Sequence, residues 1–194
     1  MEKTRPIVFI HGLGSGAFEY IPMISFLKKR GFKKFYRFTY KSKFGQVSLN
    51  DICREFAVFI KNNVTEKEFD IVGISQGGII ARLYIENYKD RKIKKCITLC
   101  SPHNGTLMAY LTRLPGFLEL RPESKLLKNL EKIGNKNVKY YCVYNPFDIV
   151  VFPGKSAILK SAEKNKKVSA PFHNLTFWTK STLQFILQSL KERR

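Results

Sequence analysis

A serine between two glycines, Ser75 in the run Gly73-Ile74-Ser75-Gln76-Gly77, is the residue of this sequence best placed to do chemistry. A serine hydroxyl becomes an effective nucleophile only when it is held exposed with a base beside it. Glycines two positions before and after the serine permit a sharp turn that presents the hydroxyl. The same pattern arises by chance in about one chain in twenty of this length, so the flanking residues decide between a nucleophile and an ordinary serine.

The residues around Ser75 predict a strand that turns directly into a helix. The segment 69–74 is short, apolar and rich in β-branched residues, as in a strand that is buried on both faces of a parallel sheet. After Gln76, apolar residues recur every three or four positions, which predicts an amphipathic helix over 76–88. The start of a helix presents unpaired backbone N–H groups where negative charge can develop. These flanks favour Ser75 as a nucleophile.

Strand-like and helix-like segments alternate along the chain and predict an α/β fold, with a mostly parallel sheet of about six strands and helices on both faces. With 194 residues and 44% hydrophobic side chains, a single domain over 1–194 is expected. The predicted strands are 6–11, 34–40, 69–74, 93–99, 138–144 and 167–170. The predicted helices are 17–30, 49–63, 76–88, 124–133 and 179–191.

The segment 101–123 interrupts this alternation, because it follows a predicted strand where a short loop would suffice. In an open α/β sheet, ligands bind beyond the carboxyl ends of the strands, which is where this segment begins. We therefore predict a small apolar lid or substrate-pocket rim, formed by Leu107, Met108, Leu111, Leu114 and Phe117. The alternative is an extra helix packed on the core.

A serine nucleophile needs a base and a carboxylate that orients the base. The chain has three histidines, His11, His103 and His173, and each follows a predicted strand, where catalytic side chains usually lie. Asp148 follows the fifth predicted strand among apolar residues, and a carboxylate in such a setting needs a hydrogen-bonded partner. A cap on a turn is the alternative role for Asp148. Position alone leaves the base open among the three histidines.

The chain order Ser75, Asp148, His173 resembles that of the α/β-hydrolase superfamily. Three motifs resemble more closely the small bacterial lipases and lipase-like acylhydrolases: PIVFIHG over 6–12, GISQGG over 73–78 and SPHNGT over 101–106. The resemblance covers nearly the whole chain. It implies a single-domain α/β-hydrolase fold and serine-dependent hydrolysis of carboxylic esters, as in a lipase or esterase, through an acyl-enzyme. Ser75 would attack the acyl carbon, His173 would take up the proton, and Asp148 would orient His173.

On the same resemblance, the backbone N–H groups of Leu13 and Gln76 would form the oxyanion hole. His11 and His103 are then expected to be structural. No metal and no organic cofactor is implied, and the substrate would be a small-molecule or lipid ester. An acyltransferase or a thioesterase on the same three residues is one alternative. A non-catalytic protein of this fold that binds a lipid or another ligand is the other.

The formal charge of +20 is the second unusual property of the chain. Many of the bases lie where predicted helices return to strands, away from the carboxyl ends, and there they complement helix dipoles. A smaller set near the expected site would favour peripheral contact with an anionic membrane: Lys41, Lys43, Arg113, Arg121 and Lys155. The sequence contains no recognisable nucleic-acid-binding module, so nucleic acid is disfavoured as a partner.

The cysteines and the N-terminus bear on the compartment. Four cysteines lie in apolar segments without a Cys-x-x-Cys pair or a histidine at metal-ligand spacing, so we expect buried free thiols. No apolar run is long enough to span a bilayer, and the first predicted strand begins too early for a signal peptide. These features predict a cytoplasmic protein. They leave the oligomeric state and the acyl group open.

Overall fold

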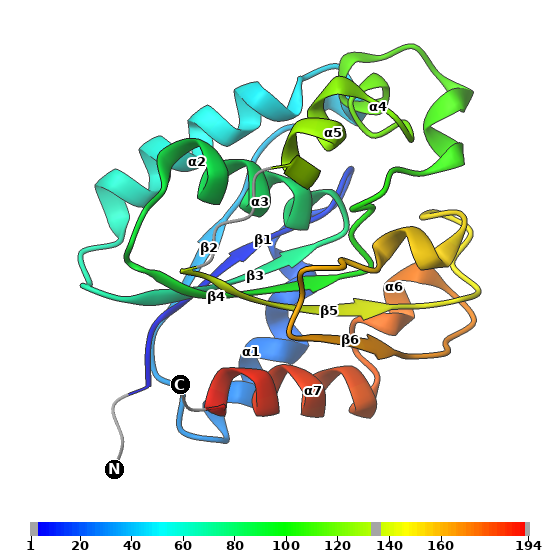
Figure 1. Cartoon of the computed structure of the whole chain (residues 1–194). Coiled ribbons are helices and arrows are strands. Elements are labelled where there is room, and N and C mark those ends of the chain that lie inside the picture. The colour runs from blue at the N-terminus through cyan, green and yellow to red at the C-terminus, as the bar shows by residue number, and fades with distance from the viewer. Residues whose placement is uncertain (1–3, 133–136, 193–194) are drawn as a thin grey trace.

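A parallel β-sheet lies between two layers of helices in the computed structural model, which describes residues 4–132 and 137–192 (Figure 1). Within these residues the strands are β1 (Ile7–Ile10), β2 (Phe35–Phe38), β3 (Phe69–Ile74), β4 (Ile93–Leu99), β5 (Lys139–Tyr144) and β6 (Lys164–Lys167). Their order is β2-β1-β3-β4-β5-β6, and every neighbouring pair is parallel. The predicted α/β class and the predicted parallel sheet are confirmed.

Helices cover both faces of the sheet, as predicted. The helices α1 (Ile21–Lys28) and α7 (Lys180–Lys191) pack on one face, and α2 (Leu49–Asn63), α3 (Gln76–Tyr88) and α5 (Lys125–Lys132) pack on the other (Figure 1). Because successive side chains of a strand point to opposite faces, β1 sends Ile7 and Phe9 into one apolar cluster and Val8 and Ile10 into the other. The central strands are therefore apolar on both faces.

Short elements follow the carboxyl ends of most strands. They are η1 (Ala17–Tyr20) after β1, η2 (Lys43–Gly45) after β2, η3 (Leu107–Leu111) and α4 (Pro115–Leu118) after β4, η4 (Gly154–Ala157) after β5, and α6 (His173–Thr176) after β6. Among the strands of the described residues, β3 alone leads directly into a long helix, through Ser75. The strand order reverses between β1 and β3, and open α/β sheets bind their ligands at such a reversal. Ser75 therefore stands at the point of the sheet that is best suited to a ligand.

Two predicted elements differ from the structure for identifiable reasons. The helix predicted over 17–30 is divided into η1 and α1, and Pro22 lies in the first turn of α1, where its missing N–H costs nothing. The sixth strand lies at Lys164–Lys167 rather than at 167–170, and all four of its residues are exposed. Lysines are common on edge strands because they discourage pairing with other chains, so an apolar pattern does not reveal such a strand. The predicted helix end at Ile133 lies outside the described residues.

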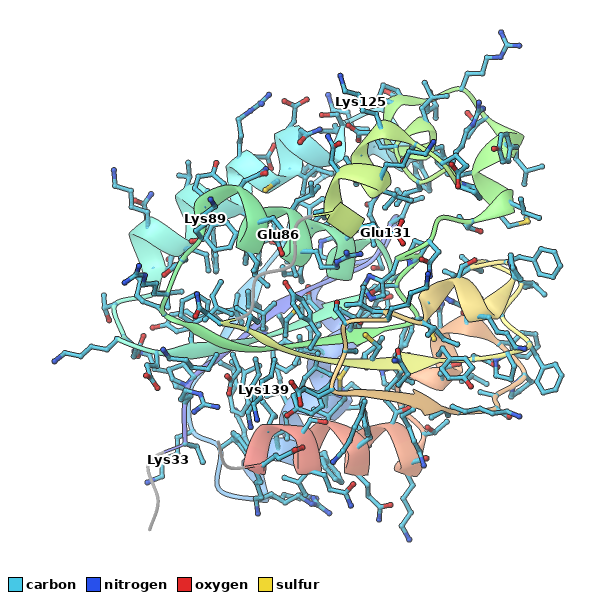
Figure 2. The ribbon with its side chains drawn as sticks, viewed as in Figure 1. Lys33, Glu86, Lys89, Lys125, Glu131 and Lys139 are labelled. Carbon is cyan, nitrogen blue, oxygen red and sulfur yellow. The ribbon has the colours of Figure 1, made fainter. Side chains whose placement is uncertain are left out.

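Basic residues lie where the strands begin, as predicted. Lys33 precedes β2, Lys89 follows α3, and Lys139 opens β5 (Figure 2). Figure 2 shows Lys33 and Lys89 on the side of the sheet opposite the carboxyl ends of the strands. Much of the positive charge is therefore remote from Ser75.

The expectations on cysteines and membrane spans can also be compared with the structure. All four cysteines are free and buried, as predicted. Burial raises the pKa of the Cys142 thiol to about 11, so this thiol is neutral near pH 7. None of the helices in the described ranges is both long enough and apolar enough to cross a membrane.

Candidate active site

Ser75 occupies a strained turn between β3 and α3, with φ 50° and ψ −121°. This backbone region is unfavourable for a serine and persists only where the surrounding structure imposes it. The Ser75 N–H donates to the Leu99 carbonyl at 2.8 Å, which ties the turn to the end of β4. A Cβ at Gly73 would lie 2.6 Å from the Gly78 backbone, and a Cβ at Gly77 would overlap the backbone at the end of β1. The two glycines of the motif therefore allow the turn to pack this closely.

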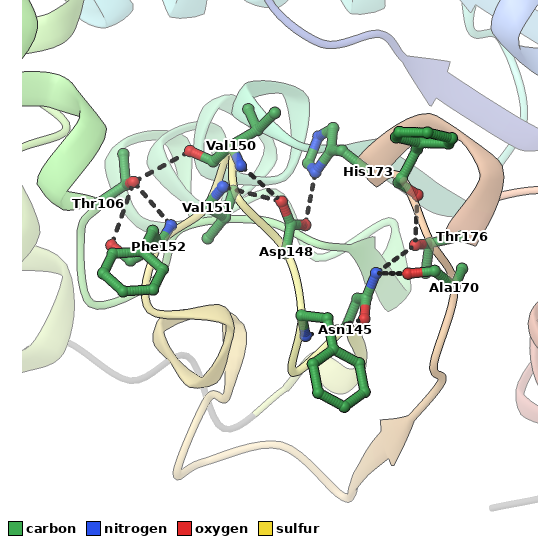
Figure 3. Close-up of polar contacts among 11 residues, drawn as sticks. Thr106, Asn145, Asp148, Val150, Val151, Phe152, Ala170, His173 and Thr176 are labelled. Carbon is green, nitrogen blue, oxygen red and sulfur yellow. Dashed lines mark hydrogen bonds and ion pairs between the residues drawn. The ribbon is translucent and has the colours of Figure 1, made fainter.

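Asp148 and His173 form a buried hydrogen-bonded pair after β5 and β6. The distance from His173 Nδ1 to Asp148 Oδ2 is 2.5 Å. The other carboxylate oxygen, Oδ1, accepts the backbone N–H groups of Val150 and Val151 at 2.9 Å and 3.0 Å (Figure 3). These bonds hold the carboxylate as an acceptor, so Nδ1 of His173 carries the hydrogen and Nε2 is the basic nitrogen. The pair can take up a proton at Nε2.

Asn145, which the sequence did not single out, joins the segments that carry Asp148 and His173. Its Nδ2 donates to the Ala170 carbonyl at 2.9 Å and to the Thr176 hydroxyl at 3.1 Å (Figure 3). Its Oδ1 accepts a backbone N–H at 3.1 Å within the turn that leads to Asp148. Asn145 is only 1% exposed, so this amide is a buried link between the two segments. Its place directly after a buried strand is the only signal in the sequence that points to it.

Leu13 and Gln76 each adjoin a residue of the serine turn: Gln76 follows Ser75 in the chain, and Leu13 follows Gly12, which packs on Ser75. A Cβ at Gly12 would lie 3.2 Å from the Ser75 Cβ, so the loop after β1 passes directly beside the serine. The Gly12 N–H donates to the carboxylate of Glu19, a buried residue, at 3.2 Å. Across the residues that the structure describes, neither the Leu13 N–H nor the Gln76 N–H donates a hydrogen bond. Two free N–H groups near a serine can stabilise an oxyanion.

His11 holds the loop after β1 in place. Its Nδ1 donates to the Gly12 carbonyl at 2.7 Å, and its Nε2 accepts the Tyr40 N–H at 3.1 Å. The His11 and Tyr40 rings stack with centroids 4.2 Å apart. Burial lowers the pKa of His11, so the ring is neutral near pH 7. With both nitrogens engaged, His11 fits the structural role that was expected of it.

His103 is likewise engaged at both nitrogens. The Arg82 guanidinium donates to Nδ1 at 3.2 Å, and Nε2 donates to the Thr98 hydroxyl at 2.8 Å. Burial and the nearby Arg82 charge hold the pKa of His103 well below its usual value. Arg82 also donates to the Leu130 carbonyl at 2.9 Å, so this network ties α3 to α5 and to the loop after β4. His103 is therefore not presented as a base.

The segment 101–123 contains η3 and α4 instead of one continuous extra helix, and it is fastened to the loop after β5. The Thr106 hydroxyl accepts the Phe152 N–H at 2.9 Å and donates to the Val150 carbonyl at 3.0 Å (Figure 3). Arg121 closes the segment by donating to two of its carbonyls at 3.2 Å and 3.0 Å. The segment 101–123 therefore rests on the loop that carries Asp148.

The five residues of 101–123 that were predicted to border the substrate pocket occupy two different environments. Leu107, Met108 and Leu111 are exposed, whereas Leu114 and Phe117 are partly buried. Phe117 packs against the apolar cluster on the α2 and α3 side of the sheet. The segment therefore has an anchored inner part and an exposed outer part.

Cys100, Asp148 and His173 offer potential metal-ligand atoms within 4.8 Å of one another. Burial and the Asp148 charge raise the pKa of the Cys100 thiol well above its usual value, which opposes the thiolate that a metal ion needs. Asp148 and His173 are also already bonded to each other. The chemistry of these groups favours an acid–base pair over a metal centre.

Cys100 also relates the acid–base pair to the serine. It follows Leu99, whose carbonyl accepts the Ser75 N–H, and its Sγ lies near both Asp148 and His173. Among the described residues, no hydrogen bond joins Ser75 Oγ to His173. Ser75 and the Asp148–His173 pair therefore share one edge of the sheet, with no hydrogen bond between serine and histidine among the described residues.

Comparison with known proteins gives a family and a fold. The profile of the palmitoyl protein thioesterase family matches residues 6–137. None of the curated proteins compared with the chain matches it significantly in sequence.

Three solved structures show the fold. Aspergillus fumigatus lipase B has a TM-score of 0.80 at 14% identity over 97% of this chain and 53% of its own. Paleococcus ferrophilus monoacylglycerol lipase has a TM-score of 0.71 at 17% identity over 95% of this chain and 93% of its own. Phospholipase PlaB from Legionella pneumophila has a TM-score of 0.65 at 19% identity over 73% of this chain, which spans only 38% of PlaB. The predicted α/β-hydrolase fold is confirmed.

Proposed function

Because this chain belongs to the palmitoyl protein thioesterase family within the α/β-hydrolase superfamily, we propose that it is a serine acylhydrolase that cleaves carboxylic esters through Ser75, His173 and Asp148. The observation that carries the proposal is the buried pair of His173 and Asp148, 2.5 Å apart, at the sheet edge that presents Ser75. A base that is oriented by a carboxylate is what a serine nucleophile requires.

The first half of the reaction makes an acyl-enzyme. Ser75 Oγ attacks the acyl carbonyl while His173 Nε2 takes the hydroxyl proton, and Asp148 stabilises the imidazolium that forms. The same proton then passes to the leaving alcohol as the bond to the acyl carbon breaks. Catalytic hydrogen bonds are often long in unliganded enzymes and tighten around substrate, which accommodates the missing bond from serine to histidine.

The second half of the reaction is the attack of water on the acyl-enzyme. His173 Nε2 removes a proton from the water and returns it to Ser75 Oγ, and the carboxylic acid leaves. In both halves the oxyanion of the tetrahedral intermediate accepts the N–H groups of Leu13 and Gln76. Each such donor typically contributes about 3–4 kcal/mol to transition-state stabilisation.

The proposed substrate is an ester with an apolar acyl chain, presented at an anionic membrane. Three features support this choice: the apolar residues of 101–123, the bases on the same edge and the lipases among the structural neighbours. The segment 101–123 would form the rim of the acyl site. A thioester is the second candidate, because the family whose profile matches is that of palmitoyl protein thioesterases.

Hydrolysis of matched acyl donors tests the proposed function. We expect turnover of nitrophenyl esters from acetyl to palmitoyl, with kcat/KM rising as the acyl chain lengthens and buries more apolar surface. Palmitoyl thioesters of coenzyme A and of a cysteine peptide measure the second candidate, and added alcohol detects acyl transfer. A protein that turns over none of these and is not labelled by a fluorophosphonate would instead be a binding protein.

We expect Asn145→Ala to lower kcat about tenfold to a hundredfold, because a small misplacement of the acid–base pair has an effect of that size. KM should change less, since the buried Asn145 side chain is not exposed to contact substrate. Loss of the buried amide should also cost about 1–3 kcal/mol of stability. Steady-state kinetics and thermal unfolding measure the two effects.

Asn104→Ala is the matched control. Asn104 also donates to two carbonyls, those of Ser156 and Ile158, but these lie in and just after η4, beyond the turn that carries Asp148 and outside the segment of His173. If both variants lose kcat equally, Asn145 has no specific role in positioning the pair.

A further inference from the structure

The six most exposed large apolar side chains of the described residues all lie in loops after the carboxyl ends of strands. They are between 60% and 76% exposed, and five loops each supply one or two of them: Phe18, Phe44, Leu111, Phe147, Ile149 and Phe172. Only β3 supplies none, because it ends at Ser75. We call these six residues the apolar rim.

Contacts between the loops gather the apolar rim at one edge. The Phe44 ring lies 3.5 Å from the position of a Cβ on Gly14, so the loops after β1 and β2 meet. Gly45 packs directly on the Phe117 ring, which joins the loops after β2 and β4. Thr106 bonds to the loop after β5, and the acid–base pair joins that loop to the one after β6. The rim therefore surrounds the edge that presents the serine.

Exposed apolar residues are scarce on the rest of the described surface. In the described part of the chain, the large apolar residues that are exposed outside these loops are Ile21 at the start of α1, Val58 on α2 and Tyr88 at the end of α3. Scattered residues of this kind need no explanation, whereas many exposed apolar residues on adjoining loops mark an interaction site.

The charge of the same loops indicates what they contact. Lys41, Lys43, Arg113 and Lys155 are exposed there. Four described carboxylates of these loops are buried or paired: Glu19 and Asp148 are buried, Glu119 accepts backbone and side-chain N–H groups of α2, and Glu123 pairs with Lys128 at 2.7 Å. Glu163 is exposed, but it directly precedes β6 and so lies at the opposite edge of the sheet. The surface is therefore apolar and cationic at once, which complements an anionic lipid headgroup layer above hydrocarbon.

We propose that the apolar rim and these four bases dock the protein on an anionic lipid bilayer, with Ser75 facing the lipid. This inference rests on the proposed function in one respect: docking would serve an enzyme whose substrate is a lipid ester. The acyl chain could then enter the site from the bilayer without passing through water. The phenyl and alkyl groups would enter the headgroup region, and the bases would approach the lipid phosphates. The lysines at the opposite edge of the sheet would face the solvent.

Co-sedimentation with vesicles tests the proposal in the Ser75→Ala background, where no lipid is consumed. We expect binding to vesicles of equal parts phosphatidylcholine and phosphatidylglycerol, and much weaker binding to phosphatidylcholine alone. Leu111→Ser/Phe147→Ser/Ile149→Ser should weaken binding at least tenfold. The control Val58→Ser/Tyr88→Ser removes exposed apolar groups elsewhere and should bind as the parent does.

Charge reversal at two places separates docking from general attraction of a cationic protein. Lys43→Glu/Arg113→Glu/Lys155→Glu should weaken binding to the anionic vesicles at least tenfold. Lys33→Glu/Lys89→Glu/Arg91→Glu changes the net charge equally at the opposite edge and should have a much smaller effect. Thermal unfolding confirms that each variant is folded.

The proposal is overturned if the parent does not bind anionic vesicles, or if the rim and control variants lose binding equally. Self-association through the rim without vesicle binding would also overturn it and would identify a second copy as the occupant. Failure of the proposed function would give a different result: the wild-type protein would bind anionic vesicles through the apolar rim but would not hydrolyse a soluble acetyl ester.

Discussion

Ser75→Ala is expected to lower kcat for ester or thioester hydrolysis by at least about 10⁴-fold, because in the proposed mechanism the Ser75 hydroxyl forms the acyl-enzyme. The fold should persist, since alanine keeps the backbone N–H that donates to Leu99 and has a Cβ of the same size. A fluorophosphonate should label the wild type at Ser75 and should leave the variant unlabelled. Residual activity should reflect only binding and the oxyanion hole.

Ser161→Ala is the control for this substitution. Ser161 is exposed in the connection between η4 and β6, away from the edge that presents Ser75. It should keep wild-type turnover and labelling. Wild-type turnover in Ser75→Ala would refute the mechanism, and labelling of another serine would move the nucleophile elsewhere.

Asp148→Asn is the second large effect, with kcat expected to fall by about 10⁴-fold at neutral pH. The asparagine oxygen can still accept the N–H groups of Val150 and Val151, so the loop should keep its shape. Without the carboxylate charge, the imidazolium form of His173 is less stable. The neutral amide also permits the unproductive tautomer of His173, with its hydrogen on Nε2. Measurements of kcat across a range of pH, together with thermal unfolding, separate loss of catalysis from loss of the fold.

The matched control is Asp70→Asn. Asp70 is a second buried carboxylate with a hydrogen-bonded partner, Arg5, whose Nε lies 3.0 Å away, but it opens β3 at the opposite edge. Its loss should reduce stability while kcat stays within a few-fold of the wild type. If Asp148→Asn also stays within tenfold, the carboxylate does not assist the base.

Much of the fold could be predicted because its elements carry local signals. The helices α2 and α3 and the strands β3 and β4 match their predicted bounds, since each is either amphipathic at the helical period or apolar on both faces. The strand β6 could not be placed, because an exposed edge strand of lysines and asparagine has no apolar pattern. Its position depends on hydrogen bonds to β5, which the local sequence does not encode.

The candidate site shows the same division. Position after predicted strands left the base open among three histidines, and the resemblance in chain order then singled out His173 with Ser75 and Asp148. Only the structure shows that His11 and His103 are buried with both ring nitrogens engaged. These properties depend on residues that lie far away in the sequence. Spacing carries no information about them.

The sequence by itself determined the turn at Ser75, because a glycine pattern, an apolar strand and a helix start are properties of adjacent residues. It also determined the α/β class, since that follows from the order of elements. Only the tertiary structure decided that His173 bonds to Asp148, that Asn145 links their segments, and that apolar side chains from five loops gather around one edge. The physical reason is that a parallel sheet brings the carboxyl ends of distant strands together, and the contacts made there are set by packing between segments.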